Sequence, residues 1–324
     1  MSARDIDARP VTLVDIPLVM RLTDDSVILD SALGYTRDVH GPNGALLSSI
    51  LLPQRGLITL LARSDKQQVI GQFRLKPDDP NAHIVYVAPG IHAEQEDTAW
   101  LNVFDAMARE AGKHQAHTLI AEVNESSLLF ETMRQCGFAV YARQQIWRLD
   151  ANSFNHHPVQ NIVLREQTDA DVPGILSLFS AVVPGMLQQV TTPAIDERGL
   201  VLKMNDHIEV FVAVVEGKNG IFVTPYLHPD LQVDTPSVFA AIVRALPRLD
   251  KLPLYVCVRR HQDWFTMSLH ALGFKPGPLQ AVMVRHITAG VRQARFESIP
   301  KGLRATPVKP PTRPLHEISL QSEM

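Results

Sequence analysis

Two histidines occupy positions from which a side chain could act as a general base. His83 lies within the apolar run "AHIVYVA", and His228 follows the apolar run that ends in "VTPYL". Histidine suits this role because its pKa lies close to physiological pH, and a strand or the loop after it can present the ring to a substrate. The alternative for both residues is a structural or solvent-exposed histidine, and the sequence alone favours that alternative.

A metal site is not indicated, although the chain contains 13 histidines. His156 and His157 are adjacent, but no His-x3-His or Cys-x2-Cys spacing occurs. Protein zinc sites usually show such spacings, so no metal is predicted. The two cysteines, Cys136 and Cys257, are interpreted as core thiols. The sequence also contains no G-x-S-x-G, P-loop or Rossmann fingerprint.

The segment "VRRHQDW", residues 258–264, gathers two arginines and a histidine at the predicted end of a strand. Ligands of α/β folds bind beyond the carboxyl ends of strands, and an arginine placed there can bind an anion. Arg259, Arg260 and His261 could therefore contact an anionic ligand. The alternative is a loop whose charged side chains are solvated, and the sequence favours that alternative.

Three acidic residues lie in the crossover "GIHAEQEDTAW", where some α/β folds place glycines that hold a phosphate. Glu94, Glu96 and Asp97 would cap the following helix and repel a polyanion, unless the two glutamates are simply solvated. The second half of the chain repeats an Asp-Thr pair before a helix, in "VDTPSVF". One residue of the Asp234–Thr235 pair is expected to be the N-cap, because the proline that follows suits a first helical turn.

Composition bounds the classes of protein to which this chain can belong. Its 324 residues suggest two domains, and its 45% hydrophobic content is sufficient for a sizeable core. A net charge of −3 gives no electrostatic argument for nucleic acid or a membrane surface as a partner. The sequence shows neither a signal-peptide pattern nor a long apolar run, and two cysteines cannot form a disulfide framework. We therefore expect a cytoplasmic protein.

The two halves of the chain repeat a motif in the same order. "RPVTLVDIP" (9–17) and "REQTDADVP" (165–173) both read R-x-x-T-x-x-D-[IV]-P. Further along, a strand and a helix lead to Gly137–Phe138 in the first copy and to Gly273–Phe274 in the second. The two R-x-x-T-x-x-D motifs lie farther apart in the sequence than the two Gly-Phe pairs do. The second copy therefore has fewer residues between its motif and its Gly-Phe pair than the first. A repeat this long indicates two copies of one domain.

Apolar periodicity places the elements that carry these residues. The first copy reads as a helix from Asp15, a hairpin over "GLITLLARSDKQQVIGQFRL", a central strand, a helix over 98–111 and a closing strand or hairpin. The second copy repeats this pattern, with a helix over 236–249. We predict an α/β fold with two domains, each a twisted mixed sheet flanked by helices. The predicted domains are 1–150 and 161–290, joined by a linker over 151–160 and followed by a disordered, Pro-rich tail over 291–324.

The order β-α-(hairpin)-β-α-β-α-(Gly-Phe)-β resembles the GNAT superfamily of acyl-CoA-dependent N-acyltransferases. The resemblance covers residues 9–149 and 161–288, and it implies that strands diverge beside the central strand so that exposed backbone groups hold the pantetheine arm. Two features of the family are missing from both copies. Neither crossover has the glycine-rich pyrophosphate loop, and Met133 and Leu269 stand where many members have a proton-donating tyrosine.

The resemblance implies a set of site residues in the first copy. Backbone groups of Val87, Ala88, Pro89 and Gly90 would hold pantetheine, and either His83 or Tyr86 would face the acceptor amine. Thr98, at the helix start, and Asn124, at a strand end, complete the cofactor candidates. Asn124 is interpreted as a turn or cap residue first, because its spacing from Gly137 differs from the family's.

Two functions remain open from the sequence. The first is an N-acyltransferase that binds acetyl-CoA or another acyl-CoA weakly, at a noncanonical site, and transfers the acyl group to a small-molecule or peptide amine. The second is a catalytically inactive protein that uses the fold for binding or as a scaffold. The acceptor, the acyl group and the oligomeric state cannot be derived from the residues.

Overall fold

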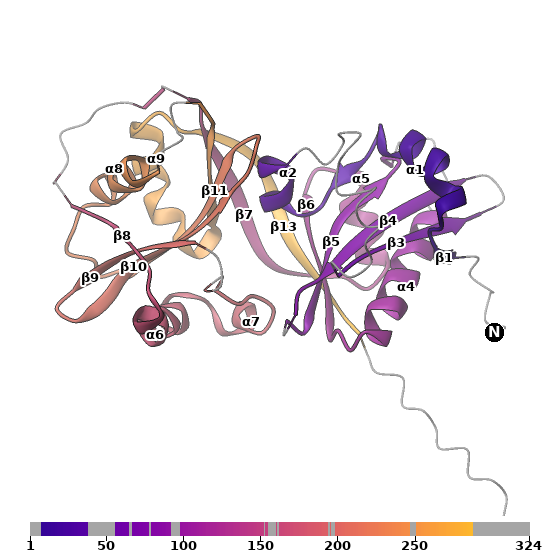
Figure 1. Ribbon diagram of the computed structural model, residues 1–324, viewed down its shortest axis with the longest axis horizontal. Coiled ribbons are helices and arrows are strands. Elements are labelled where there is room, and N and C mark those ends of the chain that lie inside the picture. Colours follow the sequence, from indigo (N-terminus) through magenta and orange to yellow (C-terminus); the bar gives the residue numbers. More distant parts are fainter. Residues whose placement is uncertain are drawn as a thin grey trace, which may run out of the picture. The chain divides into compact units, whose positions relative to one another are not determined.

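The computed structural model describes residues 8–37, 56–64, 67–77, 79–91, 98–151, 153, 154, 160, 162–193, 195, 198–246 and 251–287. These residues belong to one compact unit, which comprises residues 1–289. We call residues 8–149 the first half and residues 162–287 the second half. Strands and helices alternate in both halves (Figure 1).

The strands of the first half are β1 (Ala8–Pro10), β2 (Val27–Ile28), β3 (Leu57–Arg63), β4 (Gln68–Leu75), β5 (Asn81–Ala88), β6 (Thr118–Asn124) and β7 (Ala139–Leu149). Its helices are α1 (Ile16–Thr23), α2 (Ser31–Thr36), α4 (Thr98–Lys113) and α5 (Leu128–Gln135). The strands of the second half are β8 (Arg165–Glu166), β9 (Gly199–Met204), β10 (His207–Glu216), β11 (Ile221–Leu227), β12 (Leu254–Arg259) and β13 (Lys275–His286). Its helices are α6 (Val172–Val182), α7 (Gly185–Gln188), α8 (Thr235–Ala245) and α9 (Thr266–Ala271). Short 3-10 turns, η1 (Leu13–Asp15), η3 (Asp169–Asp171) and η4 (Arg260–Phe265), precede α1, α6 and α9.

All of these strands belong to one mixed sheet of thirteen strands. Its order is β1-β3-β4-β5-β6-β13-β7-β12-β11-β10-β9-β8, and β2 pairs with β5 outside this path. β5 runs parallel to β6 and β11 runs parallel to β12, whereas the other pairs are antiparallel. The prediction of an α/β fold with a mixed sheet flanked by helices is confirmed.

The last strand of each half lies inside the other half of the sheet. β13 is inserted between β6 and β7, and β7 is inserted between β13 and β12, so both strands cross the middle of the sheet (Figure 1). Gln144 and Gln280 are register partners at the centre of this exchange, and Gln144 Nε2 donates to Gln280 Oε1 at 3.2 Å. The sequence predicts a closing strand for each half, but it does not predict the exchange.

The predicted domains, residues 1–150 and 161–290, thus contribute strands to one sheet, and their independence stays a prediction. Most of the predicted linker and all of the predicted tail, residues 291–324, lie outside the described residues. Both predicted hairpins are present, as β3–β4 and β10–β11. The helix predicted over 236–249 is shorter than expected, because it ends at Ala245 and Leu246 has an extended backbone. A proline follows Leu246 in the sequence, and the residue before a proline is disfavoured in helical conformation.

Separate apolar cores lie on the faces of the sheet. α4 and α5 cover one face of the first half, and α1 covers the opposite face. The three aromatic residues that the sequence places in the core, Trp100, Phe104 and Phe239, are at most 1% exposed. Burying a side chain of this size contributes about 1.5–3 kcal/mol to stability, so these helices hold the sheet firmly.

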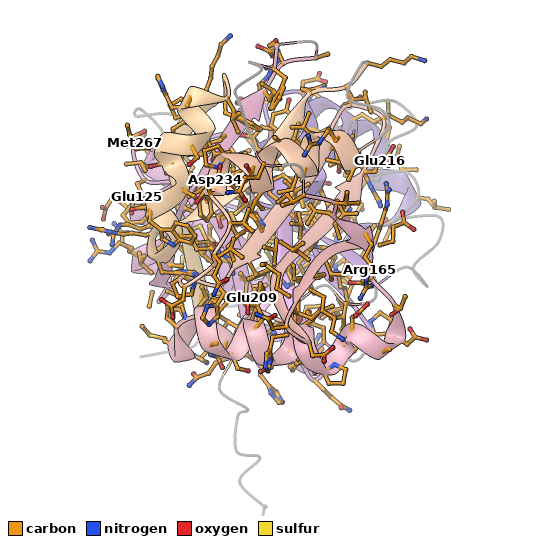
Figure 2. All side chains as sticks on the ribbon, turned by 90° about the vertical axis from the view of Figure 1, so that its left-hand side faces the viewer. Glu125, Arg165, Glu209, Glu216, Asp234 and Met267 are labelled. Atoms are coloured by element: carbon orange, nitrogen blue, oxygen red, sulfur yellow. The ribbon has the colours of Figure 1, made fainter. Side chains whose placement is uncertain are left out.

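The repeated R-x-x-T-x-x-D motif has a structural role in both halves. Arg9 donates two hydrogen bonds to the carboxylate of Asp15, at 2.7 Å each, and the backbone N–H and hydroxyl of Thr12 donate to the same carboxylate. Arg165, Thr168 and Asp171 repeat this arrangement; Arg165 is labelled in Figure 2. The arginine bonds, followed by those from threonine, hold the pKa of each aspartate well below its usual range. The motif therefore fixes the start of α1 and of α6.

Candidate functional site

The gap between β5 and β6 is the part of the first half to which the predicted cofactor residues belong. The two strands pair from Asn81 to His83, and β5 then continues to Ala88 without a partner in β6. A β-bulge lies at the point of divergence, since Ile84 and Tyr86 oppose consecutive residues of β4. Val85 and Tyr86 consequently pack in the same apolar cluster. A bulge of this kind bends a strand away from its neighbour and frees backbone groups.

Residues 27–29 occupy this gap with their own backbone. In β2, Val27 and Ile28 pair with Val87 and Tyr86 of β5. The N–H of Leu29 then donates to Val85 O, and the O of Leu29 accepts from the N–H of Glu122 in β6, both at 2.9 Å. The backbone of Leu29 therefore bridges the two diverging strands.

Asp25 occupies the far end of the same gap. The N–H of Gly90 donates to the backbone O of Asp25 at 2.6 Å and to its Oδ2 at 3.2 Å. Ala88 pairs with Ile70 of β4, and Pro89 offers no N–H. Of the four residues predicted to hold pantetheine, Val87 pairs with Val27 and Gly90 is bonded to Asp25, so these two lie against residues 25–29. Their role in binding a cofactor stays a prediction.

The two predicted catalytic residues differ in their surroundings. The ring of His83 is 28% exposed, and its Nε2 lies 3.8 Å from Asp79 Oδ2. Tyr86 is 1% exposed, packs in the cluster that contains Val19 of α1, and burial raises the pKa of its hydroxyl. Of the two, only His83 reaches solvent, so it is the better placed to meet an acceptor.

The remaining two candidates of the first half lie at the ends of other elements. Thr98 is exposed and begins α4; the crossover before it, with Glu94, Glu96 and Asp97, lies outside the described residues. Asn124 Oδ1 accepts from the N–H and the hydroxyl of Ser126, at 3.0 and 2.9 Å. The interpretation of Asn124 as a turn residue is therefore confirmed.

The second half contains an equivalent gap between β11 and β12, and the side chain of Gln262 reaches into it. These strands pair only as far as Val223 and Val256. Beyond that point Pro225 lacks an N–H, and its O accepts a hydrogen bond from Gln262 Nε2 at 2.9 Å. Gln262 is 3% exposed, so its amide lies buried in the gap.

The N-terminus of α8, beside this gap, is satisfied by the protein itself. Asp234, which is labelled in Figure 2, is the N-cap. Its carboxylate accepts from the N–H of Ser237 at 3.0 Å and from the Ser237 hydroxyl at 2.7 Å. The prediction of a cap at the Asp234–Thr235 pair is confirmed. His228, the other general-base candidate, accepts at Nδ1 from the N–H of Asp230, so it takes part in the loop structure.

Arg259 corrects the expectation for "VRRHQDW". The sequence favours a solvated loop; Arg260 is indeed exposed, but Arg259 is only 8% exposed. Arg259 continues the buried face of Tyr255 and Cys257, because side chains two apart in a strand share a face. Its guanidinium donates to the Tyr226 hydroxyl oxygen, whereas Nε and Nη1 are buried without a hydrogen-bond partner. The alternation along β12 is the signal that could have revealed this burial.

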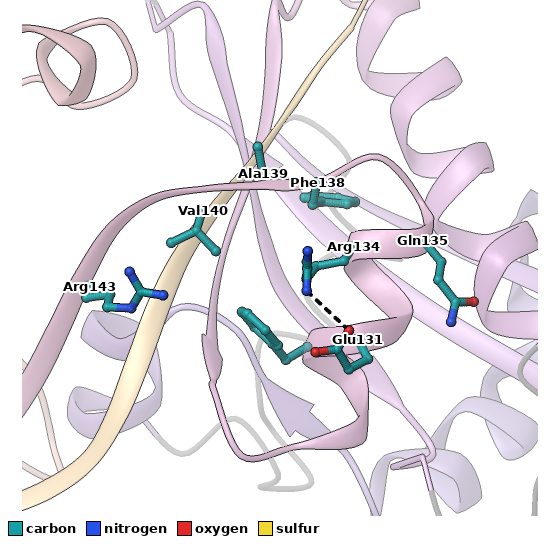
Figure 3. Close-up of a pocket in the computed structure, with 8 residues that line it drawn as sticks. Glu131, Arg134, Gln135, Phe138, Ala139, Val140 and Arg143 are labelled. Carbon is teal, nitrogen blue, oxygen red and sulfur yellow. Dashed lines mark ion pairs between the residues drawn. The ribbon is translucent and has the colours of Figure 1, made fainter.

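A groove of 820 Å³ lies between α5 and β7 (Figure 3). Its lining residues are Phe130, Glu131, Arg134, Gln135, Phe138, Ala139, Val140 and Arg143. Both arginines are already paired: Arg134 lies 3.6 Å from Glu131, and Arg143 lies 2.7 Å from Glu125. This groove therefore offers no unpaired charge to a ligand. No cluster of metal-ligating side chains occurs among the described residues, and no described helix has the length and apolarity to span a membrane.

Comparisons with known proteins identify the fold. No protein-family model and no curated protein sequence matches the chain. A tandem GNAT protein from the clavulanic acid biosynthesis pathway, solved without AcCoA, is similar over 87% of this chain and 99% of its own, with a TM-score of 0.53 and 14% identity. A GCN5-related N-acetyltransferase from Sphaerobacter thermophilus is similar over 89% and 97%, with a TM-score of 0.52 and 12% identity. The chain therefore has the GNAT fold, and function must be argued from its sites.

Proposed function

We propose that this protein is a GNAT-fold binding protein that does not transfer acyl groups from acyl-CoA, because its own chain occupies the gap in each half. The observation that carries the proposal is the backbone of Leu29, which bridges Val85 and Glu122. In the GNAT family the pantetheine arm uses backbone groups of this gap. A pantetheine could reach them here only after residues 27–29 had moved out.

The cost of that movement argues against tight binding. It breaks two backbone hydrogen bonds, each contributing about 0.5–1.5 kcal/mol, and exposes Leu29, now 2% exposed, at about 1.5–3 kcal/mol. Several kcal/mol of rearrangement lowers an apparent affinity at least about a hundredfold. The second half adds a separate obstacle, since the Asp234 carboxylate at the start of α8 would repel a pyrophosphate.

N-acyl transfer is the second candidate function. The bulged β5, the divergence from β6 and the partly exposed His83 favour it, as does the similarity to a GCN5-related N-acetyltransferase. In that case residues 25–29 would have to leave the gap, acetyl-CoA or another acyl-CoA would bind weakly, and a small-molecule or peptide amine would accept the acyl group.

Calorimetric titration with acetyl-CoA separates the two functions. We expect no saturable binding by the wild type at concentrations up to about 1 mM. We call residues 27–29, which occupy the gap between β5 and β6, the plug. Replacing Ile28 and Leu29 together by glycine removes the side chains that hold the plug in place, and should produce measurable binding of acetyl-CoA. Ile175→Gly, in the buried face of α6 in the second half, is the control for general destabilisation and should not produce binding. Micromolar binding by the wild type would refute the closed gap, and release of free CoA in the presence of an amine would establish the transferase instead.

A further inference from the structure

Residues 25–36 form a short segment that contacts both halves of the molecule, and we call this segment the strap. It begins at Asp25, contains the plug, and ends with α2. Asp30 fixes the passage from the plug to the helix. Its Oδ2 lies 2.8 Å from Nη2 of Arg74 in β4, and its Oδ1 accepts from the N–H of Leu33 at 3.1 Å as the N-cap of α2. The strap therefore runs from the first gap directly into a capped helix, with no loop between them.

Ser31, the first residue of α2, connects strands that belong to different halves. Its N–H donates to Glu122 Oε2 of β6 at 2.9 Å, and its hydroxyl donates to Gln280 Oε1 of β13 at 3.1 Å. Gln280 also accepts from Gln144, so the start of α2 is bonded at the place where the two closing strands are exchanged. Because the N–H of Glu122 donates to Leu29 O, the plug and the start of α2 share a partner.

The C-terminal turn of α2 packs against the second half. The ring of Tyr35 stacks on Tyr255 of β12, with the ring centroids 4.4 Å apart, and lies 6.3 Å from the ring of Phe222 in β11. Thr36 is fully buried, and its O accepts from the N–H of Asn219, in the turn between β10 and β11, at 3.2 Å. This turn of the helix thus belongs to the first half in sequence and to the second half in packing.

Gly217, at the same β10–β11 turn, lets the backbone of the strap come this close. A Cβ atom on Gly217 would lie 1.9 Å from Thr36 O, and the three atoms nearest to it all belong to Thr36. A side-chain rotation cannot relieve such an overlap, because the carbonyl is part of the main chain. Gly217 does not have a positive φ, so its own conformation does not require glycine. Glycine is needed here because the strap lies against the turn.

We propose that the strap moves as one element, and that its contacts with the second half keep the first gap closed. Only Asp30 separates the plug from α2, so residues 27–29 leave the gap only when the start of α2 moves with them. Opening the first gap therefore requires α2 to leave the β10–β11 turn, and access to the gap is controlled from the second half. This inference rests on the proposed function, since it takes the closed gap as the resting state, and it adds how that gap is regulated.

Hydrogen exchange of backbone amides in the full chain, without any ligand, tests the coupling. Gly217→Ala places a methyl group against Thr36 O, at the end of the strap that is farther along the sequence from the gap. We expect the amides of Leu29 and Glu122 to exchange about tenfold or more faster than in the wild type, because the strap opens more often. Amides of β3 and β4, which pair with each other outside the strap, should change less.

Gly185→Ala is the matched control, because no atom lies within 4 Å of the added methyl group, and it should leave the amides of Leu29 and Glu122 unchanged. Tyr35→Leu is a milder second variant, which keeps an apolar side chain but loses the stacking on Tyr255. It should accelerate the same two amides about two- to tenfold, and it keeps the test decisive if Gly217→Ala does not fold.

Unchanged exchange of both amides in Gly217→Ala and in Tyr35→Leu would overturn the proposal. Equal acceleration of amides throughout the molecule would also overturn it, since the strap would then not open as an element of its own. The outcome is separate from that of the acetyl-CoA titration. Micromolar binding of acetyl-CoA by the wild type would refute the proposed function, whereas a selective response of Leu29 and Glu122 to Gly217→Ala would still show that the second half controls the gap.

Discussion

The two gaps of this sheet are closed in physically different ways. In the first half a main-chain segment enters the gap, and Leu29 completes the hydrogen bonds of β5 and β6. In the second half a side-chain amide, Gln262, reaches a strand whose proline has no donor to offer. The first arrangement satisfies the backbone of both strands. The second provides one side-chain hydrogen bond, to the carbonyl of Pro225 in β11.

This difference indicates which gap is closed more strongly. The backbone of residues 27–29 behaves like an added strand, and removing it breaks several interactions together. Gln262 contributes a single side-chain hydrogen bond, from its Nε2 to Pro225 O. We therefore expect closure of the first gap to contribute more to stability than closure of the second.

The largest effect should come from weakening the plug of the first half. Leu29→Ala removes a side chain that is 2% exposed, and we expect it to lower the free energy of unfolding by about 2–4 kcal/mol. Urea denaturation measures the change. Leu176→Ala, at an exposed position of α6, should change it by less than about 0.5 kcal/mol. If Leu29→Ala lowered the free energy of unfolding as little as Leu176→Ala, residues 27–29 would contribute little to closing the gap.

A smaller effect is expected from the plug of the second half. Gln262→Leu removes the amide that donates to Pro225 O and leaves that carbonyl buried without a partner, which should cost about 1–3 kcal/mol. The same denaturation experiment checks it. If Gln262→Leu lowered the free energy of unfolding as much as Leu29→Ala or more, the first gap would not be the more strongly closed of the two.

The smallest effects should be equal in the two halves, because the repeated motif is built identically in both. Asp15→Asn and Asp171→Asn each lose the charge that accepts from arginine and threonine, and each should cost about 1–2 kcal/mol at pH 7. The folded-state pKa of both aspartates is lowered. Their contribution is therefore complete above the unfolded pKa of about 3.9, and is lost as the pH falls through the folded value.

Denaturation of the wild type and the two variants over a range of pH tests this prediction. The variants should differ from the wild type at pH 7 and should approach it in acid. A difference that does not shrink as the pH falls would show that packing, and not the carboxylate charge, stabilises the motif.

Much of the fold could be predicted from local patterns. Strand alternation located both hairpins, and the repeated motif and Gly-Phe pairs revealed the internal repeat. The exchange of β7 and β13 could not be predicted, because a closing strand has the same apolar pattern whichever half receives it. β2 could not be predicted either, because its two residues are too few to show a period. The alternation along β12 places Arg259 on the face of Tyr255 and Cys257, but the sequence of the strand alone does not show that other elements cover that face.

Hydrogen exchange of the backbone amides of Leu29 and Glu122 tests the central claim most directly, because these two N–H groups form the bridge across the first gap. We predict that both exchange at least about a hundredfold more slowly than in an unstructured peptide, and that adding acetyl-CoA changes neither rate. Exchange of both amides at the unstructured rate, or a marked acceleration with acetyl-CoA, would contradict the account, since it would mean that residues 25–29 leave the gap readily.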